Sequence, residues 1–201
     1  MYRPPAFEMD DGEAFALVAA QPLAQLIVAT VDGLQATPVP LIARGDTLVG
    51  HLARLNPFWH HPGPALAIFT GAQAYISPNW FPSKREHGRV VPTWNYETVH
   101  VHGTLVVHDD DEWKLGVLTA LTDRFEAASP VPWKVTDAPA EYIAAAVRNV
   151  VGIELVDLRV EAKSKLSQNR AEPDRLGAID GLRGGNAEQS AVAARMSTPP
   201  A

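Results

Sequence analysis

An Asp-Gly pair between two alternating apolar segments constrains the fold of this chain more than any other feature. Residues 25–31 and 34–41 alternate apolar and polar side chains on either side of Asp32-Gly33. Such a pair between two alternating segments favours a short β-hairpin turn. A second turn at 44–46 leads into a third segment at 47–53. The first quarter of the chain therefore predicts three successive antiparallel strands.

Helical spacing appears on both sides of these strands. Residues 11–20 open with acidic side chains and stop before a proline, which predicts a short helix. Apolar residues four apart between 113 and 125 predict a second helix, and 138–150 a third. Further strands are expected at 65–70, 74–77, 99–108 and 153–162, with a turn at Gly71 between the first two. This order predicts a mainly β chain with added helices, an α+β barrel.

The length sets the domain organisation. The chain has 201 residues, which fits one domain, and we assign residues 1–183 to it. Residues 184–201 are small and polar and end in prolines, so we expect a disordered C-terminal tail. The N-terminus carries prolines and acids rather than a basic and then apolar leader, and apolar segments are too short to span a membrane. A soluble, cytoplasmic protein is expected.

Composition excludes several kinds of chemistry. The chain has no cysteine, which removes disulfides, thiolate catalysis and cysteine-based metal sites. Lys and Arg number 17 against 23 Asp and Glu, a net charge of −6, which argues against a surface built to cover nucleic acid. Neither glycine-rich phosphate-binding motif, of the Rossmann or the P-loop kind, is present.

Aromatic residues gather in one region of the sequence. Eight of the fifteen lie between Phe58 and Tyr96, and residues 78–96 are expected to form a long loop. Rigid rings in a loop offer flat apolar walls to a planar ligand. They also serve to cover the end of a barrel, and both interpretations stay open at this point.

Cations near this region suggest a place for an anion. Polar and basic side chains surround the loop, and residues 163–185 carry five cations against three acids. Such a segment can hold a phosphate through charge-assisted hydrogen bonds, or can be a solvated basic turn. His100 and His102 share one face of an expected strand, with Glu97 the nearest further ligand, but the spacing matches no metal signature and we assign no metal site.

Five separated blocks together resemble one family. They are Met1-Tyr2 with Pro4 and Phe7, the segment 51–57, the segment 75–84, the segment 91–103, and the segment 165–170 with Gly181-Leu182. The set resembles the PaiB-type family of FMN-binding negative transcriptional regulators, which are flavin-reductase-like split barrels. The resemblance covers almost all of residues 1–185.

This resemblance implies a split β-barrel, a homodimer, and FMN held where the two subunits meet. Contact with DNA is implied by the resemblance alone, because the chain shows no helix-turn-helix with a basic recognition helix. The alternative function is a flavin-dependent oxidoreductase that uses NAD(P)H. The resemblance implies FMN-binding residues in four groups. Arg54 and Lys84 are implied at the phosphate, and His51, Leu52, Asn56 and Thr93 along the ribityl chain and ring. Trp80, Trp94 and Asn95 are implied near the ring, Lys165, Ser167, Gln168 and Arg170 at the closing side of the site, and Ser77 is included without a specific role.

Overall fold

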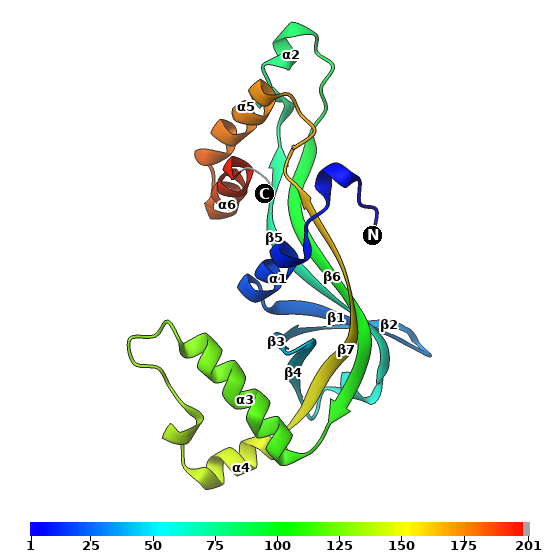
Figure 1. Cartoon of the computed structure of the whole chain (residues 1–201), viewed down its shortest axis with the longest axis vertical. Coiled ribbons are helices and arrows are strands. Elements are labelled where there is room, and N and C mark those ends of the chain that lie inside the picture. The colour runs from blue at the N-terminus through cyan, green and yellow to red at the C-terminus, as the bar shows by residue number, and fades with distance from the viewer. Residues whose placement is uncertain (199–201) are drawn as a thin grey trace. The chain divides into compact units, whose positions relative to one another are not determined.

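The strands of this protein form a single sheet. The structure is a computed structural model that describes residues 1–198 (Figure 1). Within those residues the sheet has seven strands in the order β2-β1-β5-β6-β7-β4-β3, and β1 pairs antiparallel with both β2 and β5. The expected mainly β, α+β class is confirmed. The strands are β1 Leu23–Thr30, β2 Gly33–Pro40, β3 Ile42–Arg44, β4 Thr47–Ala53, β5 Gly63–Ile76, β6 Thr93–His108 and β7 Val150–Lys165.

Six helices and four short 3₁₀ turns connect or cover these strands in the described residues. None of these helices has the length and apolar character needed to cross a membrane. The helices are α1 Asp11–Ala20, α2 Ser83–Glu86, α3 Asp111–Glu126, α4 Ala140–Arg148, α5 Glu172–Arg183 and α6 Ala187–Ser197. The 3₁₀ turns are η1 Pro5–Phe7, η2 Pro57–His60, η3 Pro78–Trp80 and η4 Val135–Asp137.

The Asp-Gly hairpin is confirmed. Strands β1 and β2 pair from Leu23 opposite Pro40 to Thr30 opposite Gly33, and Gly33 has a φ of 114°. The Thr30 hydroxyl donates to the Gly33 carbonyl at 2.9 Å and closes the turn. A local signal was sufficient here, because all the atoms that fix the turn lie within four residues.

The turn expected at Gly71 is wrong. Strand β5 runs unbroken from Gly63 to Ile76, with Gly71 in its interior. A Cβ atom at Gly71 would lie 2.9 Å from Leu17 Cδ1 and 3.0 Å from Glu97 Cβ. This glycine therefore permits a close approach of α1 and β6 to the strand rather than a change of direction.

The long loop expected over residues 78–96 is also only partly present. The segment contains η3 and α2, and β6 already begins at Thr93. The Ser77 hydroxyl accepts from Asn79 N and starts η3, while the Asp174 carboxylate accepts from the backbone and hydroxyl of Ser83 and holds the start of α2. The Asp174 contacts come from a residue 91 positions away, which a reading of the segment alone cannot anticipate.

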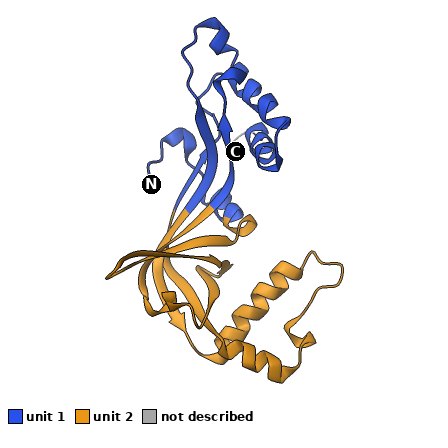
Figure 2. Ribbon diagram, turned by 180° about the vertical axis from the view of Figure 1, so that it is seen from behind, with its two compact units in different colours: residues 1–17, 70–99, 161–201 blue, residues 18–69, 100–160 orange. Residues whose placement is uncertain are grey.

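The chain divides into two compact units, coloured separately in Figure 2. Unit 1 comprises residues 1–17, 70–99 and 161–201, and unit 2 comprises residues 18–69 and 100–160. The sequence suggested one domain over residues 1–183 from its length. In the structure β5, β6 and β7 each supply residues to both units.

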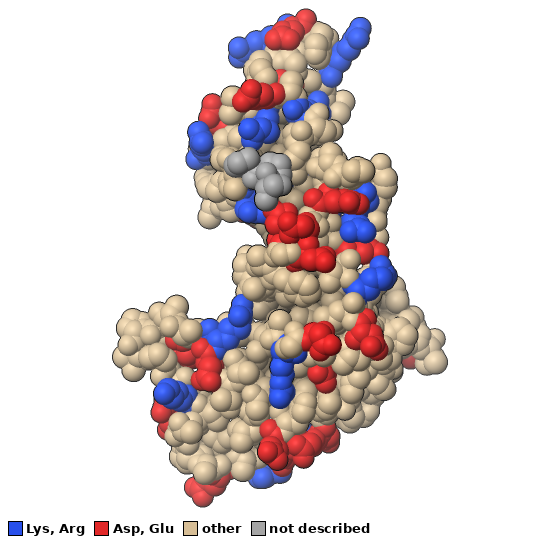
Figure 3. All heavy atoms as spheres, in the orientation of Figure 1, with Lys and Arg blue, Asp and Glu red and all other residues tan. Residues whose placement is uncertain are grey.

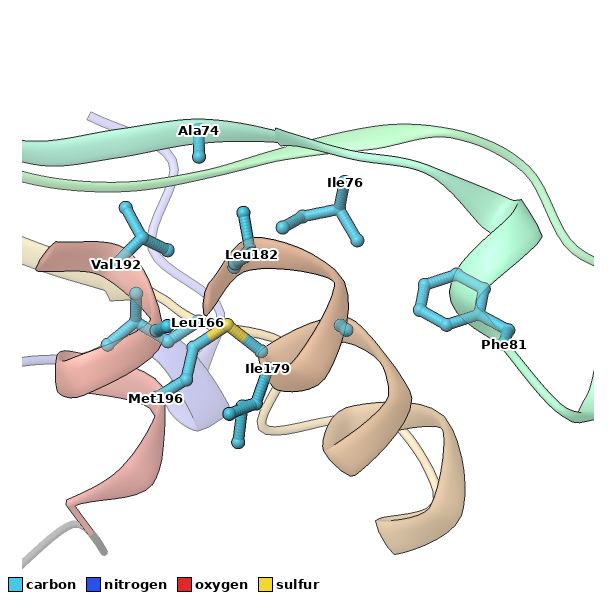
Figure 4. Close-up of a cluster of buried hydrophobic side chains, with 10 residues drawn as sticks. Ala74, Ile76, Phe81, Leu166, Ile179, Leu182, Val192 and Met196 are labelled. Atoms are coloured by element: carbon cyan, nitrogen blue, oxygen red, sulfur yellow. The ribbon is translucent and has the colours of Figure 1, made fainter. Parts of the chain in front are cut away.

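Unit 1 has its core between the sheet and the two C-terminal helices (Figure 4). Ala74 and Ile76 on β5 lie in one buried cluster with Leu182 on α5 and with Val192 and Met196 on α6. These side chains are between 0 and 3 % exposed, so α6 is a packed helix.

The disorder expected from residue 184 therefore does not hold for residues 187–197. The Asn186 side chain accepts from Gln189 N at 2.9 Å, and the Gln189 side chain accepts from Asn186 N at 2.9 Å. This reciprocal capping box begins α6 and satisfies two backbone donors. The remainder of the expected tail, residues 199–201, lies outside the described residues.

Unit 2 packs α3 against the sheet. Asp110 caps the helix by accepting from Trp113 N at 2.8 Å. Val117 and Leu121, two of the residues spaced four apart, are buried in one cluster with Ile42 and Val49, whereas Phe125 is half exposed.

Candidate functional site

The fourteen site residues suggested by the sequence fall in both units, and each group is described within its own unit. Unit 2 holds four of them: His51, Leu52, Arg54 and Asn56. Unit 1 holds the other ten: Ser77, Trp80, Lys84, Thr93, Trp94, Asn95, Lys165, Ser167, Gln168 and Arg170.

Arg54 makes a structural clasp in unit 2. Its Nε donates to the Arg148 carbonyl at 2.7 Å, and Nη2 donates to the Val150 carbonyl at 3.1 Å. Nη1 and Nη2 donate to the two oxygens of the Asp109 carboxylate and form a bidentate ion pair with it. Because each of its nitrogens already has an acceptor, Arg54 joins the end of β4 to the segments before α3 and β7.

The other end of the clasp is Asp109. Hydrogen bonds from Arg54 and then from Lys114 hold the pKa of this carboxyl well below its ordinary value of 3.8. Lys114 is itself buried and contacts Asp109 at 3.0 Å and Asp111 at 2.8 Å. The ionised form of Asp109 is therefore stabilised in the folded protein.

Asp109→Asn is expected to lower the free energy of unfolding at pH 7. A carboxyl whose pKa is depressed by folding stabilises the protein above its unfolded pKa and loses that contribution as the pH falls. The difference between the variant and the parent should therefore shrink as the pH drops below about 3.8. Urea unfolding at pH 7 and at pH 2.5 measures it, with Asp46→Asn in an exposed turn as the control. An unchanged difference at both pH values would show that charge is not the cause.

The remaining unit 2 residues lie around the same end of β4. Asn56 caps η2 by accepting from Phe58 N at 3.0 Å, and its amide donates to Thr37 Oγ1 at 3.2 Å. Leu52 is buried. His51 Nδ1 is buried and has no hydrogen-bond partner within residues 1–198, and burial lowers the pKa of this imidazole. His51 is thus held neutral, with one ring nitrogen unused.

Unit 1 brings Thr93, Trp94 and Lys165 together. Lys165 Nζ donates to the Trp94 carbonyl at 2.6 Å and to Thr93 Oγ1. Lys163, two residues earlier and so on the same side of β7, donates to the Tyr2 carbonyl at 3.2 Å. Both ammonium groups lie over the ring of Tyr96, at 5.4 and 6.0 Å from its centroid.

Two exposed aromatic rings adjoin this contact. Trp94 is 54 % exposed and Tyr75 44 % exposed, and their rings meet edge to face with centroids 6.2 Å apart. Alternation along β6 places Trp94 and Tyr96 on one side of the strand. We call Tyr75, Trp94, Tyr96, Lys163 and Lys165 the lysine–aromatic face.

The two ammonium groups of this face are bound to carbonyl and hydroxyl oxygens and lie over aromatic rings, and Lys163 is only 7 % exposed. Neither lysine forms an ion pair with a carboxylate within residues 1–198. Burial, followed by the charges of Lys163 and Arg170, lowers the pKa of Lys165. An anion bound beside the two ammonium groups would relieve this repulsion. Lys163 was not among the suggested residues, although its spacing of two from Lys165 on an expected strand was a usable signal.

Other suggested residues face the helices and hold the end of β7. Asn95 is fully buried, and its amide donates to Ser167 Oγ at 3.0 Å and to Met196 Sδ at 3.3 Å. Gln168 accepts from Leu166 N at 2.7 Å and donates to the Ser164 carbonyl at 2.6 Å. These contacts give Asn95, Ser167 and Gln168 a structural role at the turn into α5.

The last four of the site residues suggested by the sequence lie around η3 and α2; they are Ser77, Trp80, Lys84 and Arg170. Ser77 caps η3, and Lys84 donates to Asn79 Oδ1. Trp80 packs against α5 at Gly181, and the Arg170 guanidinium lies 5.0 Å from the centroid of the Phe81 ring. The contacts of these four residues are with α5 and with the turns themselves, and of the four Arg170 also acts on Lys165 through its charge.

His100 and His102 lie on the unit 2 part of β6. Within residues 1–198 no three His, Asp or Glu side chains are grouped as metal ligands.

Comparison with known proteins relates this chain to a family of FMN-binding domains. Residues 1–157 match the model of a family described as "Putative FMN-binding domain". "Protease synthase and sporulation protein PAI 2" of Bacillus subtilis is 31 % identical over 193 residues, which cover 91 % of this chain and 89 % of that protein. An uncharacterized protein of Saccharomyces cerevisiae is 39 % identical over 87 residues, 41 % of this chain. The match spans about half of the yeast protein, 52 % of its length.

A solved structure supports the fold class. The FAD and heme binding protein from Mycobacterium smegmatis superposes with a TM-score of 0.62 at 20 % identity, covering 86 % of this chain and 80 % of that one. At this identity the likeness concerns the fold alone. The expected α+β split barrel is confirmed.

Proposed function

This chain belongs to the FMN-binding domain family that its first 157 residues match, and from that membership we propose that it is a homodimeric, flavin-dependent regulator or redox sensor. Its cofactor is FMN. The proposed location of the FMN phosphate is the lysine–aromatic face, and the observation that carries this is the pair of lysines without a carboxylate partner in residues 1–198.

The residues of this face fit the two ends of FMN. A phosphate dianion is bound by cations and hydroxyl donors, which Lys163, Lys165 and Thr93 supply. The exposed rings of Trp94 and Tyr75 offer the apolar surface that a flat heterocycle needs. When bound, FMN supplies the electron-accepting ring, and a chain without cysteine has no thiol redox chemistry of its own.

We propose that regulation does not rest on a broad DNA-binding surface of this chain. Basic and acidic side chains are intermixed over the face drawn in Figure 3. The net charge of −6 agrees with this, because DNA binding needs locally concentrated positive charge. The exposed aromatic rings instead suit a protein contact, and in this proposal a second copy of the chain covers them; sedimentation equilibrium measures the oligomeric state.

A second candidate function is an FMN-dependent oxidoreductase that takes electrons from NAD(P)H. In this alternative no second copy covers the rings of Trp94 and Tyr75, and their exposure favours it, because an open face admits a second molecule. Anaerobic mixing of FMN-loaded protein with NADPH separates the two functions. Loss of flavin absorbance within seconds supports the oxidoreductase, and a stable oxidised spectrum supports the sensor.

Lys165→Met is expected to weaken FMN binding at least tenfold, because it removes one of the two ammonium groups proposed to face the phosphate. Calorimetric titration with FMN measures the dissociation constant, and riboflavin, which lacks the phosphate, should bind the variant and the parent equally. Lys134→Met removes the same charge at an exposed position in unit 2 and is the matched control.

Lys84→Met tests the phosphate position suggested by the sequence. Tenfold weakening by Lys84→Met together with unchanged binding by Lys165→Met would place the phosphate at α2 and overturn the proposed position. Circular dichroism of each variant shows whether the fold is retained.

A further inference from the structure

Unit 1 contains a cavity on the other side of β7 from the lysine–aromatic face. Its volume is about 420 Å³, within the range of small-molecule sites. Ser164 of β7 and Leu166, the residue just after the strand, line it, whereas the Lys165 side chain belongs to the opposite side of β7 from Ser164. N-terminal residues and the segments around α5 and α6 complete the wall.

Charges of both signs line this cavity, and the Arg195 guanidinium, which is bound to Glu97, also lies within electrostatic reach of Glu13. Three arginines and three glutamates contribute to it, namely Arg170, Arg175, Arg195, Glu8, Glu13 and Glu172. Within residues 1–198 none of these glutamates forms an ion pair with any of these arginines. Opposite charges that border one space yet stay apart are the arrangement that a ligand with two charged ends would bridge.

Two of the arginines are held in place by other groups. Arg195 Nε and Nη2 are bound to the buried Glu97 carboxylate at 2.8 to 3.1 Å, and Arg175 Nη1 donates to the Met196 carbonyl at 2.5 Å. These anchors use part of each guanidinium and leave Arg195 Nη1, Arg175 Nη2 and Arg175 Nε without a described acceptor. A guanidinium fixed in this way loses little side-chain entropy when it binds a carboxylate.

We propose that this cavity binds a small zwitterion of the amino acid or dipeptide class. The ligand carboxylate lies at the arginines, its ammonium group lies at the glutamates, and its side chain contacts Leu166 and Met196. Gln168 and Arg170, which the resemblance implied near FMN, line this cavity, so its separateness from FMN rests on the proposed position of the phosphate at the lysine–aromatic face.

The test is a calorimetric and thermal-shift screen of the whole protein, with and without FMN. The probes are the free amino acids, a set of dipeptides, and for each ligand that binds, its N-acetyl and its C-amide derivative. We expect at least one zwitterion to bind saturably, and both derivatives to bind at least tenfold more weakly, because each removes one charge.

Variants assign the binding to this cavity. Glu172→Gln is expected to weaken the zwitterion at least fivefold, and Arg175→Lys to weaken it through loss of the planar fork, while FMN titration stays unchanged in both. Asp180→Asn, on the same helix and exposed, is the control. The proposal is overturned if no probe binds, if the derivatives bind as well as the parent ligand, or if both variants bind normally.

Discussion

Arg195→Met is expected to destabilise the protein by about 3–5 kcal/mol, the usual cost of leaving a buried charge without its partner. Glu97 is only 3 % exposed, and Arg195 supplies three of its hydrogen bonds. The same contact raises the pKa of Arg195, chiefly through the hydrogen bond with Glu97. Without the arginine, the one hydrogen bond left to the Glu97 side chain within residues 1–198 comes from the Ser164 hydroxyl at 3.2 Å.

Urea unfolding of four proteins measures this effect. The double variant Glu97→Gln with Arg195→Met should recover a large part of the lost stability, because no buried charge remains. Arg183→Met removes an exposed arginine from α5, and a change under about 1 kcal/mol is expected there. A double variant no more stable than Arg195→Met alone would contradict the buried-charge explanation.

Gly181→Val is expected to cost about 3 kcal/mol or more, through overpacking of α5 against η3. A Cβ atom at Gly181 would lie 2.3 Å from Trp80 Cδ2, and one at Gly177 would lie 2.1 Å from the Trp80 carbonyl oxygen. These two glycines are four residues apart and share one helix face. The indole therefore lies directly on the helix backbone, and any side chain at Gly181 pushes the two apart.

Thermal unfolding followed by tryptophan emission detects the loss, because Trp80 changes its surroundings when α5 moves. Gly184→Ala is the matched control, since a Cβ atom there meets nothing within 4 Å and φ is −86°. The control should change stability by under about 1 kcal/mol. A Gly181 variant as stable as this control would show that Trp80 does not require the glycine.

The parts of the fold that the sequence predicted are those decided within a few residues. The helix at 11–20, the Asp-Gly hairpin and the Asn56 cap each depend on neighbouring positions alone. Gly71 was misread because a turn and a close approach call for the same residue, and only the partner residues Leu17 and Glu97 distinguish them. Helix α6 was missed because few of its side chains are apolar and buried, namely those of Val192, Ala193 and Met196.

The candidate site was harder to predict for the same reason. Arg54 was expected at a phosphate, but its acceptors lie 55, 94 and 96 positions away in the chain, and no local pattern reveals that they occupy it. The contact of Lys165 with Thr93 and Trp94 spans about 70 residues, and it was suggested by the resemblance rather than by spacing. The charge pattern did indicate residues 163–170, the segment that contains Lys163 and Lys165, without indicating which partners these cations have.

A fragment of this protein that ends where the family match ends would be cut within strand β7. The family match stops at residue 157, but the strand continues to Lys165. Cutting there would remove the outer half of β7 together with α5 and α6, and would uncover Ala74, Ile76 and Phe81. A fragment with that much newly wetted apolar surface would self-associate. The end of the family match at residue 157 is therefore not a domain boundary at which the chain can be shortened.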